Sequence, residues 1–435
     1  MEEMALNKRQ KELLELLRSE IKPATGCTEP IAVAYAVATA KEQVNGELKS
    51  LEIQVDPNIY KNGLMVTIPG TKEKGLVAGA ALGFVAGDPK KELRVIDNVK
   101  KEDLKKAKLL IEQKKVNLSL KKDCHGLYIE VILIANESKV RIIIKDSHLN
   151  IVNIEKINKG EEFKPFLAEN KKINSSENII QKYRLKDFIE FSNKISVNEM
   201  DFLKEGIEMN LAIAEEGLKI ENGVGVKFRE MVEEGLMADN IINRAQMLCA
   251  AASEARMSGS RLPVMSTAGS GNHGITAFLT TFAVSEKNNM PEEQLVRALA
   301  LTNLITIFIK SYTGALSAMC GCGVAAGIGA SAGAVYLLGG NKKQILGAMY
   351  NMVGSIAGII CDGAKEGCAY KLALASGWAV QAAILSMKGA IINKNDGILA
   401  GDFKKLFKNL GYTCNPGMVP TDEAILEIML EKEKA

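Results

Sequence analysis

Two kinds of hydrophobic pattern divide the chain. In the first part, short β-branched runs alternate apolar and polar residues, a period of two that predicts strands. These runs lie at residues 51–55, 64–68, 127–135, 139–145 and 149–154. Apolar residues with a helical period flank or separate them, at 8–20, 31–44, 76–86 and 102–113. The pattern predicts an α+β domain with a mainly antiparallel sheet over residues 1–157.

The pattern changes after a polar connection. Residues 158–178 keep no sustained period, and we interpret 158–184 as a linker. Strand alternation almost disappears from Leu185 onward, where helical periods recur at 185–194, 198–217, 239–257, 291–309, 323–338, 342–360 and 369–388. The second part, 185–435, is therefore predicted to be an all-α domain.

Glycine and alanine are common in the predicted helices of the second domain. Of the 38 glycines, 23 lie from Gly259 onward. A glycine inside a helix costs about 1 kcal/mol relative to alanine. That cost is acceptable where helix backbones must approach each other, or a cofactor, closely, and packing alone is a sufficient explanation.

Composition narrows the class of protein. A chain of 435 residues that is 47% hydrophobic and 25% charged is typical of a globular protein with two or three domains, and it excludes disorder and fibres. The 55 basic and 52 acidic side chains leave a net charge of +3, which gives no indication of a nucleic-acid partner. The first residues lack the apolar core of a signal peptide, and the Gly/Ala/Ser-rich stretch 320–340 is interpreted as a buried helix. We expect a cytoplasmic protein with a small-molecule partner and no membrane; a homodimer is one expectation for its assembly.

A reducing compartment keeps the eight cysteines free for metal binding or catalysis. The first candidate is Cys27, in the segment ATGCTEP ahead of an alanine-rich helix. Because Pro30 is favoured in the first helical turn, Cys27 and Thr28 should lie at a helix N-terminus. The helix dipole and the unpaired N–H groups there favour a thiolate, whereas Glu29 opposes it. Cys27 is either a base or nucleophile, or an ordinary small residue.

A second group of cysteines lies late in the chain. Cys320 and Cys322 form a CGC element, and Cys361 and Cys368 flank the segment DGAKEG, whose glycines allow it to loop. Zinc sites usually show short pairs at two-to-four spacing, which these cysteines lack. Dispersed thiolates suit an iron–sulfur cluster better. Buried reduced cysteines are the alternative.

Other polar segments interrupt the predicted elements. STAGSGNHG (266–274) matches GxGxxG, but a helical pattern precedes it, so we interpret it as a turn or as an anion seat at a helix start, not as a dinucleotide site. Segments 56–63 and 69–71 are turns first, with Asn58, Lys61 and Thr71 as candidates for substrate contact. Cys124 and His125 are adjacent in an expected strand and should face opposite sides.

Five of these elements together resemble the L-cysteine desulfidase family, which is similar to the iron–sulfur L-serine dehydratases. They are ATGCTEP, the IPGT turn at 68–71, GSGNHG, CGCG and ICDGAKEGC, and they occur in this order over nearly the whole chain. The resemblance implies a [4Fe–4S] cluster held by Cys320, Cys361 and Cys368, with Cys322 competing for the first place and one iron open to substrate. It also implies that Cys27 is the base.

That resemblance implies β-elimination of L-cysteine to pyruvate, ammonia and hydrogen sulfide, without PLP. Cys27 would take the Cα proton, while Thr28 and Glu29 shape its surroundings and Ser270, Gly271, Asn272 and His273 hold the substrate carboxylate. The site should then lie between the two domains. The alternatives are L-serine dehydration on the same scaffold, a non-catalytic metal- or anion-binding protein, and a PLP lyase, for which no lysine stands in a suitable context.

Overall fold

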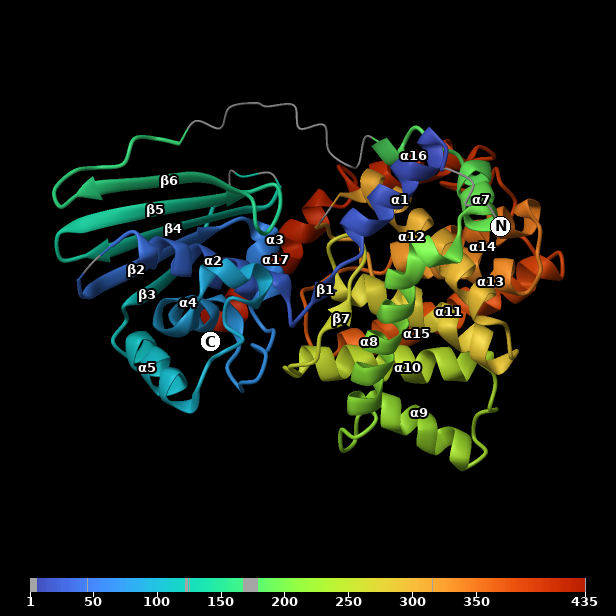
Figure 1. The fold of residues 1–435 in the computed structure, drawn as a ribbon, viewed down its shortest axis with the longest axis horizontal. Helices are drawn as coiled ribbons and strands as arrows, with labels where there is room; N and C mark the ends of the chain where they lie inside the picture. The colour runs from blue at the N-terminus through green and yellow to red at the C-terminus, as the bar shows by residue number, and fades with distance from the viewer. Residues whose placement is uncertain are drawn as a thin grey trace.

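The structure is a computed structural model that describes residues 6–44, 46–121, 124, 126–166, 179–314 and 316–434. Two large hydrophobic clusters organise it. One lies between a five-stranded sheet and the helices that cover it, and the other lies inside an array of helices. Figure 1 shows the two parts of the molecule to which they belong, the sheet with its helices on the left and the array of helices on the right. The predicted fold class, an α+β domain followed by a helical one, is confirmed.

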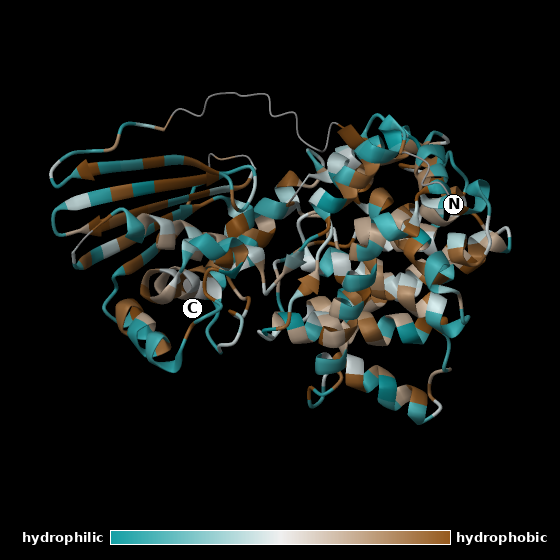
Figure 2. Ribbon diagram, in the orientation of Figure 1, coloured by the Kyte–Doolittle hydropathy of each residue, from teal (hydrophilic) through white to brown (hydrophobic). Residues whose placement is uncertain are grey.

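The sheet has the strand order β3-β2-β4-β5-β6. Its strands are β2 (Leu48–Val55), β3 (Val116–Leu120), β4 (Tyr128–Ala135), β5 (Ser138–Lys145) and β6 (Ile151–Asn158). All pairs are antiparallel except β2 with β3. Alternate residues of β2 and β4 are buried, and Figure 2 shows the matching alternation of hydrophobic and hydrophilic positions. One face of the sheet therefore supplies the core.

Helices cover that face. They are α2 (Thr28–Glu42), α3 (Pro57–Gly63), α4 (Gly75–Ala86), the 3-10 helix η1 (Pro89–Arg94) and α5 (Lys101–Glu112). The pair α2 and α4 packs closely because a glycine replaces a side chain at each contact: a Cβ on Gly79 would lie 2.7 Å from the Pro30 carbonyl oxygen. Such close packing needs glycine at these positions of α4.

The helical part of the molecule contains most of the remaining elements. These are α7 (Leu185–Lys194), η2 (Val197–Met200), α8 (Asp201–Gly217), α9 (Val224–Glu233), α10 (Ile241–Met257), α11 (Gly271–Lys287), α12 (Glu292–Thr313), α13 (Ala325–Leu337), α14 (Lys342–Ile356), α15 (Cys368–Met387) and α16 (Phe403–Cys414). Small residues let the central helix α13 pack closely: a Cβ on Gly329 would lie 2.6 Å from the Thr302 carbonyl oxygen of α12. Close helix packing alone therefore accounts for glycine at this position.

Each of the two terminal helices packs on the part of the molecule formed by the other end of the chain. Helix α1 (Lys8–Glu20) buries Leu13 and Leu17 in the helical cluster, and α17 (Val419–Lys434) contributes Leu426 to the sheet cluster. The hydrophobic clusters thus depart from the predicted division into 1–157 and 185–435 at both ends of the chain. A pair of two-residue strands, β1 (Pro23–Ala24) with β7 (Val264–Met265), connects the segment between α1 and α2 to the segment between α10 and α11.

Several elements differ from the sequence prediction. The strand predicted at 64–68 is wrong: only Thr67 forms a bridge, with Lys74, and the segment turns through Pro69 and Gly70 between α3 and α4. Its buried apolar residues, Val66 and Ile68, produced the strand pattern. Strand β3 and helices α9, α11, α16 and α17 lay outside the predicted ranges. Of the predicted linker, 167–178 lies outside the described residues.

Two described helices are long and apolar enough to cross a membrane, α12 and α15. In α12, 83% of the apolar window is buried inside the protein, and in α15 the share is 56%. Both helices contribute to the helical cluster. The stretch 320–340, singled out from the sequence, contains the shorter helix α13 instead.

Helix α3 depends on one buried carboxylate. Asp56 accepts hydrogen bonds from the backbone N–H groups of Asn58 (2.8 Å), Ile59 (3.2 Å) and Tyr128 (2.8 Å), so it caps α3 and ties it to β4.

We expect Asp56→Ala to lower the free energy of unfolding by about 2–4 kcal/mol, because it leaves buried donors unpaired. Urea titration measures this. The exposed cap of η1 is the control, and Asp88→Ala should cost about 1 kcal/mol or less. Equal costs would contradict the role of Asp56.

Asp56 also gives the stability a pH dependence. Burial raises the pKa of Asp56 to about 6, against the lowering effect of its three backbone donors. Between pH 4 and pH 6 folding takes up a proton at this carboxyl, so its contribution to stability falls as the pH rises, and it stays constant above that window. Relative to Asp56→Asn, the wild type should lose up to about 3 kcal/mol between pH 4 and pH 7. A stability difference that does not change with pH would refute the shift.

Candidate active site

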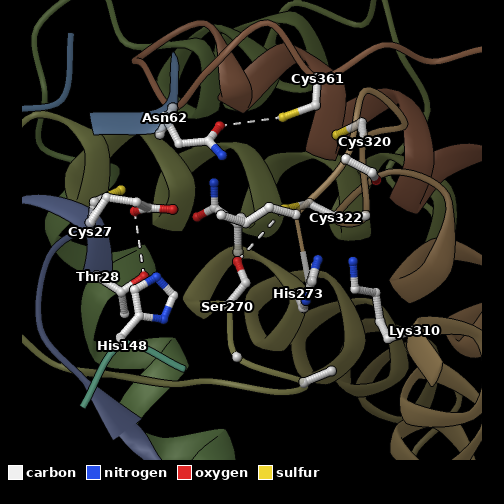
Figure 3. A pocket seen from close by; sticks show the side chains of 18 of the residues that line it. Cys27, Thr28, Asn62, His148, Ser270, His273, Lys310, Cys320, Cys322 and Cys361 are labelled. Atoms are coloured by element: carbon white, nitrogen blue, oxygen red, sulfur yellow. Dashed lines mark hydrogen bonds between the residues drawn. The ribbon is translucent and has the colours of Figure 1, made fainter. Parts of the chain in front are cut away.

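One cavity of about 230 Å³ lies where the two parts of the molecule meet. The α+β part contributes the start of α2, the end of α3 and the β5–β6 turn, and the helical part contributes the start of α11, α12, the loop after it and the segment before α15. Figure 3 shows Cys27, Thr28 and His148 on one side of this cavity and the cysteines of the helical part on the other. Nine of the predicted site residues line it: Cys27, Thr28, Glu29, Ser270, Asn272, His273, Cys320, Cys361 and Cys368.

Cys27 is the N-cap of α2, as the position of Pro30 predicted. The preceding Gly26 has a φ of +65°, and a side chain there would clash with Pro69. This is why the segment requires glycine, and it fixes the ATGC turn against the IPGT turn. Arg256 of α10 holds the same turn from the other side by donating from Nη2 to the Gly26 carbonyl oxygen at 2.6 Å.

The electrostatics of Cys27 differ from the expectation based on the helix dipole. Only 5% of the residue is exposed, and burial raises the pKa of its thiol to about 12. The guanidinium of Arg256 lowers it, whereas Glu29 raises it further. Desolvation of the charged form outweighs the helix N-terminus, and Arg256 is the basic side chain that counteracts it.

The backbone places Cys320 and Cys361 side by side. Met319 and Ile360 form an isolated antiparallel bridge, in which the Cys320 N–H donates to Ile359 at 2.8 Å and the Cys361 N–H donates to Ala318 at 2.6 Å. The two sulfurs therefore come from adjacent strand-like segments 41 residues apart in the sequence. Figure 3 shows both side chains on the same wall of the cavity, with Cys322 nearby.

Cys368 is the first residue of α15, and the loop between it and Cys361 is held in place by ion pairs. Asp362 binds Lys371 and also Lys365, at 2.5 Å, and these cations lower its pKa to about 2. Gly363 has a φ of +92° and lies against the Lys61 carbonyl oxygen, so only glycine fits there. The loop is thus fixed both within itself and against α3.

Backbone N–H groups act on the three predicted ligands: those of Gly323, Gly363 and Lys365 favour the thiolates of Cys320, Cys361 and Cys368, respectively. For Cys361 and Cys368 burial outweighs this effect and raises the pKa. The neighbouring Cys322 thiol, together with Lys371, lowers the pKa of Cys320. Hydrogen bonds to sulfur are among the features by which proteins tune iron–sulfur clusters.

These cysteines suit a cluster better than a single ion. Among the described residues, no three cysteine, histidine, aspartate or glutamate side chains converge on one metal-ion position. A cluster presents separate irons at its corners, and its thiolates stand farther apart than the ligands of one ion. All four cysteines of the group are unpaired and line the cavity, as do Lys310 and Lys371. The donor set therefore fits a [4Fe–4S] cluster.

The GSGNHG segment begins α11 and is not a dinucleotide-binding turn: the strand before it is the short β7, paired antiparallel with β1. Asn272 accepts from Arg256 Nη1 at 3.0 Å, and His273 donates from Nδ1 to the Thr267 carbonyl oxygen at 3.1 Å. Burial, together with the charges of Lys310 and Arg256, lowers the pKa of His273 to about 3. His273 is therefore neutral, with Nε2 on the side of Gly321.

Four predicted substrate-binding residues do not line the cavity. Gly271 lies behind it, against Arg256 and Val264. Lys61 is 1% exposed and pairs with Asp422 of α17. Asn58 lies in the first turn of α3, and the Thr71 hydroxyl closes its own turn by donating to the Ile68 carbonyl oxygen at 2.9 Å. Cys124 lies outside the cavity lining, and His125 lies outside the described residues.

Sequence reasoning missed several residues that line the cavity. Three of them are basic side chains on helices α10, α12 and α15: Arg256, Lys310 and Lys371. The other two are Asn62, which accepts a hydrogen bond from the Cys361 thiol at 3.7 Å, and His148 in the β5–β6 turn. Lys310 gave a usable signal, because it follows the apolar run LITIFI and a buried helix has no ordinary place for a lysine. Asn62 and His148 gave none, since both belong to polar turn segments.

Comparison with known proteins identifies the family. The sequence model of the family described as "Serine dehydratase alpha chain" matches residues 90–427. The chain belongs to this family. It is also 46% identical over 420 residues to a UPF0597 protein of Clostridium tetani, covering 97% of this chain and 98% of that one. A UPF0597 protein of Caldanaerobacter subterraneus is 43% identical over 424 residues (97% and 98% coverage), and one of Clostridioides difficile is 40% identical over 427 residues (97% and 100%).

The resemblance to the iron–sulfur serine dehydratases is thus confirmed at the level of the family. The matched region begins at residue 90, inside η1, and includes all four clustered cysteines and the GSGNHG segment. Cys27 and the IPGT turn lie before it. The matching UPF0597 proteins align over nearly the full chain and are named without an activity.

Proposed function

We propose that the protein is an L-cysteine desulfidase, which converts L-cysteine to pyruvate, ammonia and hydrogen sulfide. The observation that carries the proposal is the shared cavity, which Cys27, the cysteine group and the start of α11 all line. A serine dehydratase relationship supports elimination of a β-substituent from a small amino acid. The five motifs favour cysteine as that amino acid.

In the proposed reaction, Cys27 Sγ takes up the Cα proton of the substrate. The Cα–H electron pair then forms the Cα=Cβ bond, and the Cβ–S bond breaks with both of its electrons going to sulfur. Sulfide leaves, and the aminoacrylate tautomerises and is hydrolysed to pyruvate and ammonia. The positive charge of Arg256 lowers the pKa of Cys27, against the effect of burial. Its hydrogen bond to the Gly26 carbonyl oxygen also holds the backbone turn that carries Cys27.

The start of α11 is proposed to hold the substrate carboxylate. Ser270 is the N-cap of α11 and does not use its side chain to cap the helix, and the Asn272 amide is oriented by Arg256. A helix N-terminus favours an anion through its unpaired N–H groups and its dipole. Because His273 is neutral and bound to Thr267, it contributes a fixed polar surface and no charge.

Cys320, Cys361 and Cys368 are proposed to hold a [4Fe–4S] cluster. When bound, the cluster would supply a Lewis acid at an iron that no protein thiolate occupies. The residues around it have roles of their own: backbone N–H groups favour the three thiolates, and Asn62 of α3 reaches Cys361 from the other part of the molecule. His273, Cys320 and Glu29 are each less than a tenth exposed, so these three groups are shielded from bulk water.

L-Serine is the second candidate substrate, favoured by the description of the family as serine dehydratase alpha chain. Anaerobic assay of iron-loaded protein with each amino acid decides between them. We expect sulfide and pyruvate in equal amounts from L-cysteine. Pyruvate from L-serine without sulfide from L-cysteine would make the protein a dehydratase, and turnover of neither would leave a binding protein. Sensitivity to carbonyl reagents without dependence on iron would indicate a PLP lyase.

Arg256 yields a separate prediction. Arg256→Gln should lower kcat/KM for L-cysteine by about 100-fold, because one amide cannot hold both the Gly26 carbonyl and Asn272 and carries no charge toward Cys27. Steady-state kinetics measure this, with circular dichroism to check the fold. Arg261 is the matched control: it is exposed, and Arg261→Gln should stay within about twofold of the wild type. A kcat/KM for Arg256→Gln close to the wild-type value would refute the role.

A further inference from the structure

His148 is a buried polar group in the cavity that the proposed reaction does not use. It lies in the turn between β5 and β6, and its Nε2 is shielded from solvent without any hydrogen-bond partner among the described residues. A buried nitrogen without a hydrogen-bond partner destabilises the folded protein. The presence of such a nitrogen in a cavity wall is explained if a bound ligand forms a hydrogen bond with it.

The turn that carries His148 is built to hold it in place. Asp146 adopts a φ of +69°, an uncommon conformation for a residue other than glycine. Its N–H donates to the Leu127 carbonyl oxygen at 3.1 Å, and the Asn150 amide donates to the Lys145 carbonyl oxygen at 2.9 Å. Both ends of the turn are therefore tied to the sheet, and His148 is directed to the cavity.

Glu29 lines the same cavity, and its charge acts on the His148 ring. Glu29 is 7% exposed and accepts a long hydrogen bond from Thr28 Oγ1 at 3.4 Å. The Glu29 charge raises the pKa of His148, whereas burial lowers it more, so the ring is neutral. Figure 3 shows His148 beside Thr28, across the cavity from Cys322 and Cys361.

The charged side chains around His148 indicate which kind of ligand group can bind there. Glu29 and the exposed Asp146 bring negative charge to the lining around His148, whereas Arg256 is held at the Gly26 carbonyl oxygen and at Asn272. Lys310 and Lys371 belong to the helical part. A neutral imidazole with its proton on Nδ1 presents a lone pair at Nε2. A hydrogen-bond donor that carries positive charge complements both a carboxylate and this lone pair, and the α-ammonium of an amino acid is such a group.

We infer that Glu29 and His148 form the seat for the substrate's α-ammonium group, with His148 Nε2 and a Glu29 oxygen as acceptors. This inference rests on the proposed function and adds to it a substrate class: α-amino acids with an unblocked amino group. The ammonium binds at the α2 side and the carboxylate at the start of α11, so the two charged ends orient the Cα–H bond toward Cys27.

Calorimetry on the anaerobically purified holoenzyme tests the seat without chemistry. L-Alanine carries both charged groups but no leaving group, and propionate lacks the ammonium. The Kd of L-alanine should rise about tenfold or more in His148→Leu and in Glu29→Gln. His148→Gln keeps an acceptor and should lose less, and Glu52→Gln, which removes a carboxylate on the sheet outside the cavity, should match the wild type. Propionate should bind equally to all of them.

The contrary results are distinct. Equal weakening of L-alanine and propionate would make His148 and Glu29 merely structural, and unchanged L-alanine binding in His148→Leu, or none in the wild type, would overturn the seat. The proposed function is tested separately by sulfide release. Protein that binds L-alanine as expected but releases no sulfide refutes the function and keeps the seat. If the wild type releases sulfide and His148→Leu has an unchanged KM for L-cysteine, the function is kept and the seat is refuted.

Discussion

Cys27→Ala abolishes sulfide and pyruvate formation from L-cysteine while the protein keeps its iron; this is the expected result if Cys27 is the base. A positioned general base contributes about 10²–10⁴-fold to the rate. We therefore expect kcat to fall at least about 1000-fold. Because Cys27 comes from the other part of the molecule and is not one of the proposed ligands, its removal should leave iron and acid-labile sulfide at wild-type levels.

The control for this variant is Cys249→Ala. Cys249 is also fully buried, but its thiol contacts Ile275 and Thr280 inside the helical cluster, away from the cavity. It should retain activity apart from a modest loss of stability. Sulfide release by Cys27→Ala at more than a tenth of the wild-type rate would remove the assignment of the base without affecting the ligand set.

Cys361→Ala and Cys368→Ala should each lose most of their iron and acid-labile sulfide, and with them all detectable activity. A cluster held by three thiolates loses a third of its protein ligands in either variant. Iron analysis and the visible absorption of protein purified without air measure the loss. Comparison of Cys320→Ala with Cys322→Ala assigns the first ligand: the variant that loses iron identifies it.

Cys414→Ser is the matched control, since the Cys414 thiol is buried against the Thr313 carbonyl oxygen and lies outside the cavity lining. Its iron content should equal that of the wild type. Full iron content in Cys361→Ala or Cys368→Ala would refute the ligand set. Wild-type protein that is colourless and free of iron, yet fully active, would overturn the whole account.

Much of the fold follows from local patterns in the sequence. The limits of α1 agree with the prediction to the residue, and β4 and β5 lie within a residue of the predicted ranges, because the period of apolar positions is strong there. Strand β3 was not predicted, because its sequence VNLSL is short and about half polar. The prediction at 64–68 failed because β-branched residues are buried in an irregular turn as well as in a strand.

The candidate site was predictable where the chemistry comes from motifs. The cysteines and the start of α11 occur in recognisable segments, and they meet in one cavity. Arg256, Asn62 and His148 were not predictable, because each reaches the cavity through the packing of one part of the molecule on the other. Asn58, Lys61 and Thr71 show the converse: their segments lie near the site in sequence and fold, but none of the three side chains lines the cavity. Thr71 closes its own turn, and Lys61 pairs with Asp422.

The exchange of terminal helices bears on how the protein is made. During synthesis, the α+β part emerges early, but the counter-ion of Lys61, Asp422, is made 361 residues later. Since α3 also carries Asn62 into the cavity, the pocket reaches its final form only when α17 has been made and packs on α3. A chain cut short before that helix would be missing the partner of an enclosed ammonium group, even though every cysteine were present.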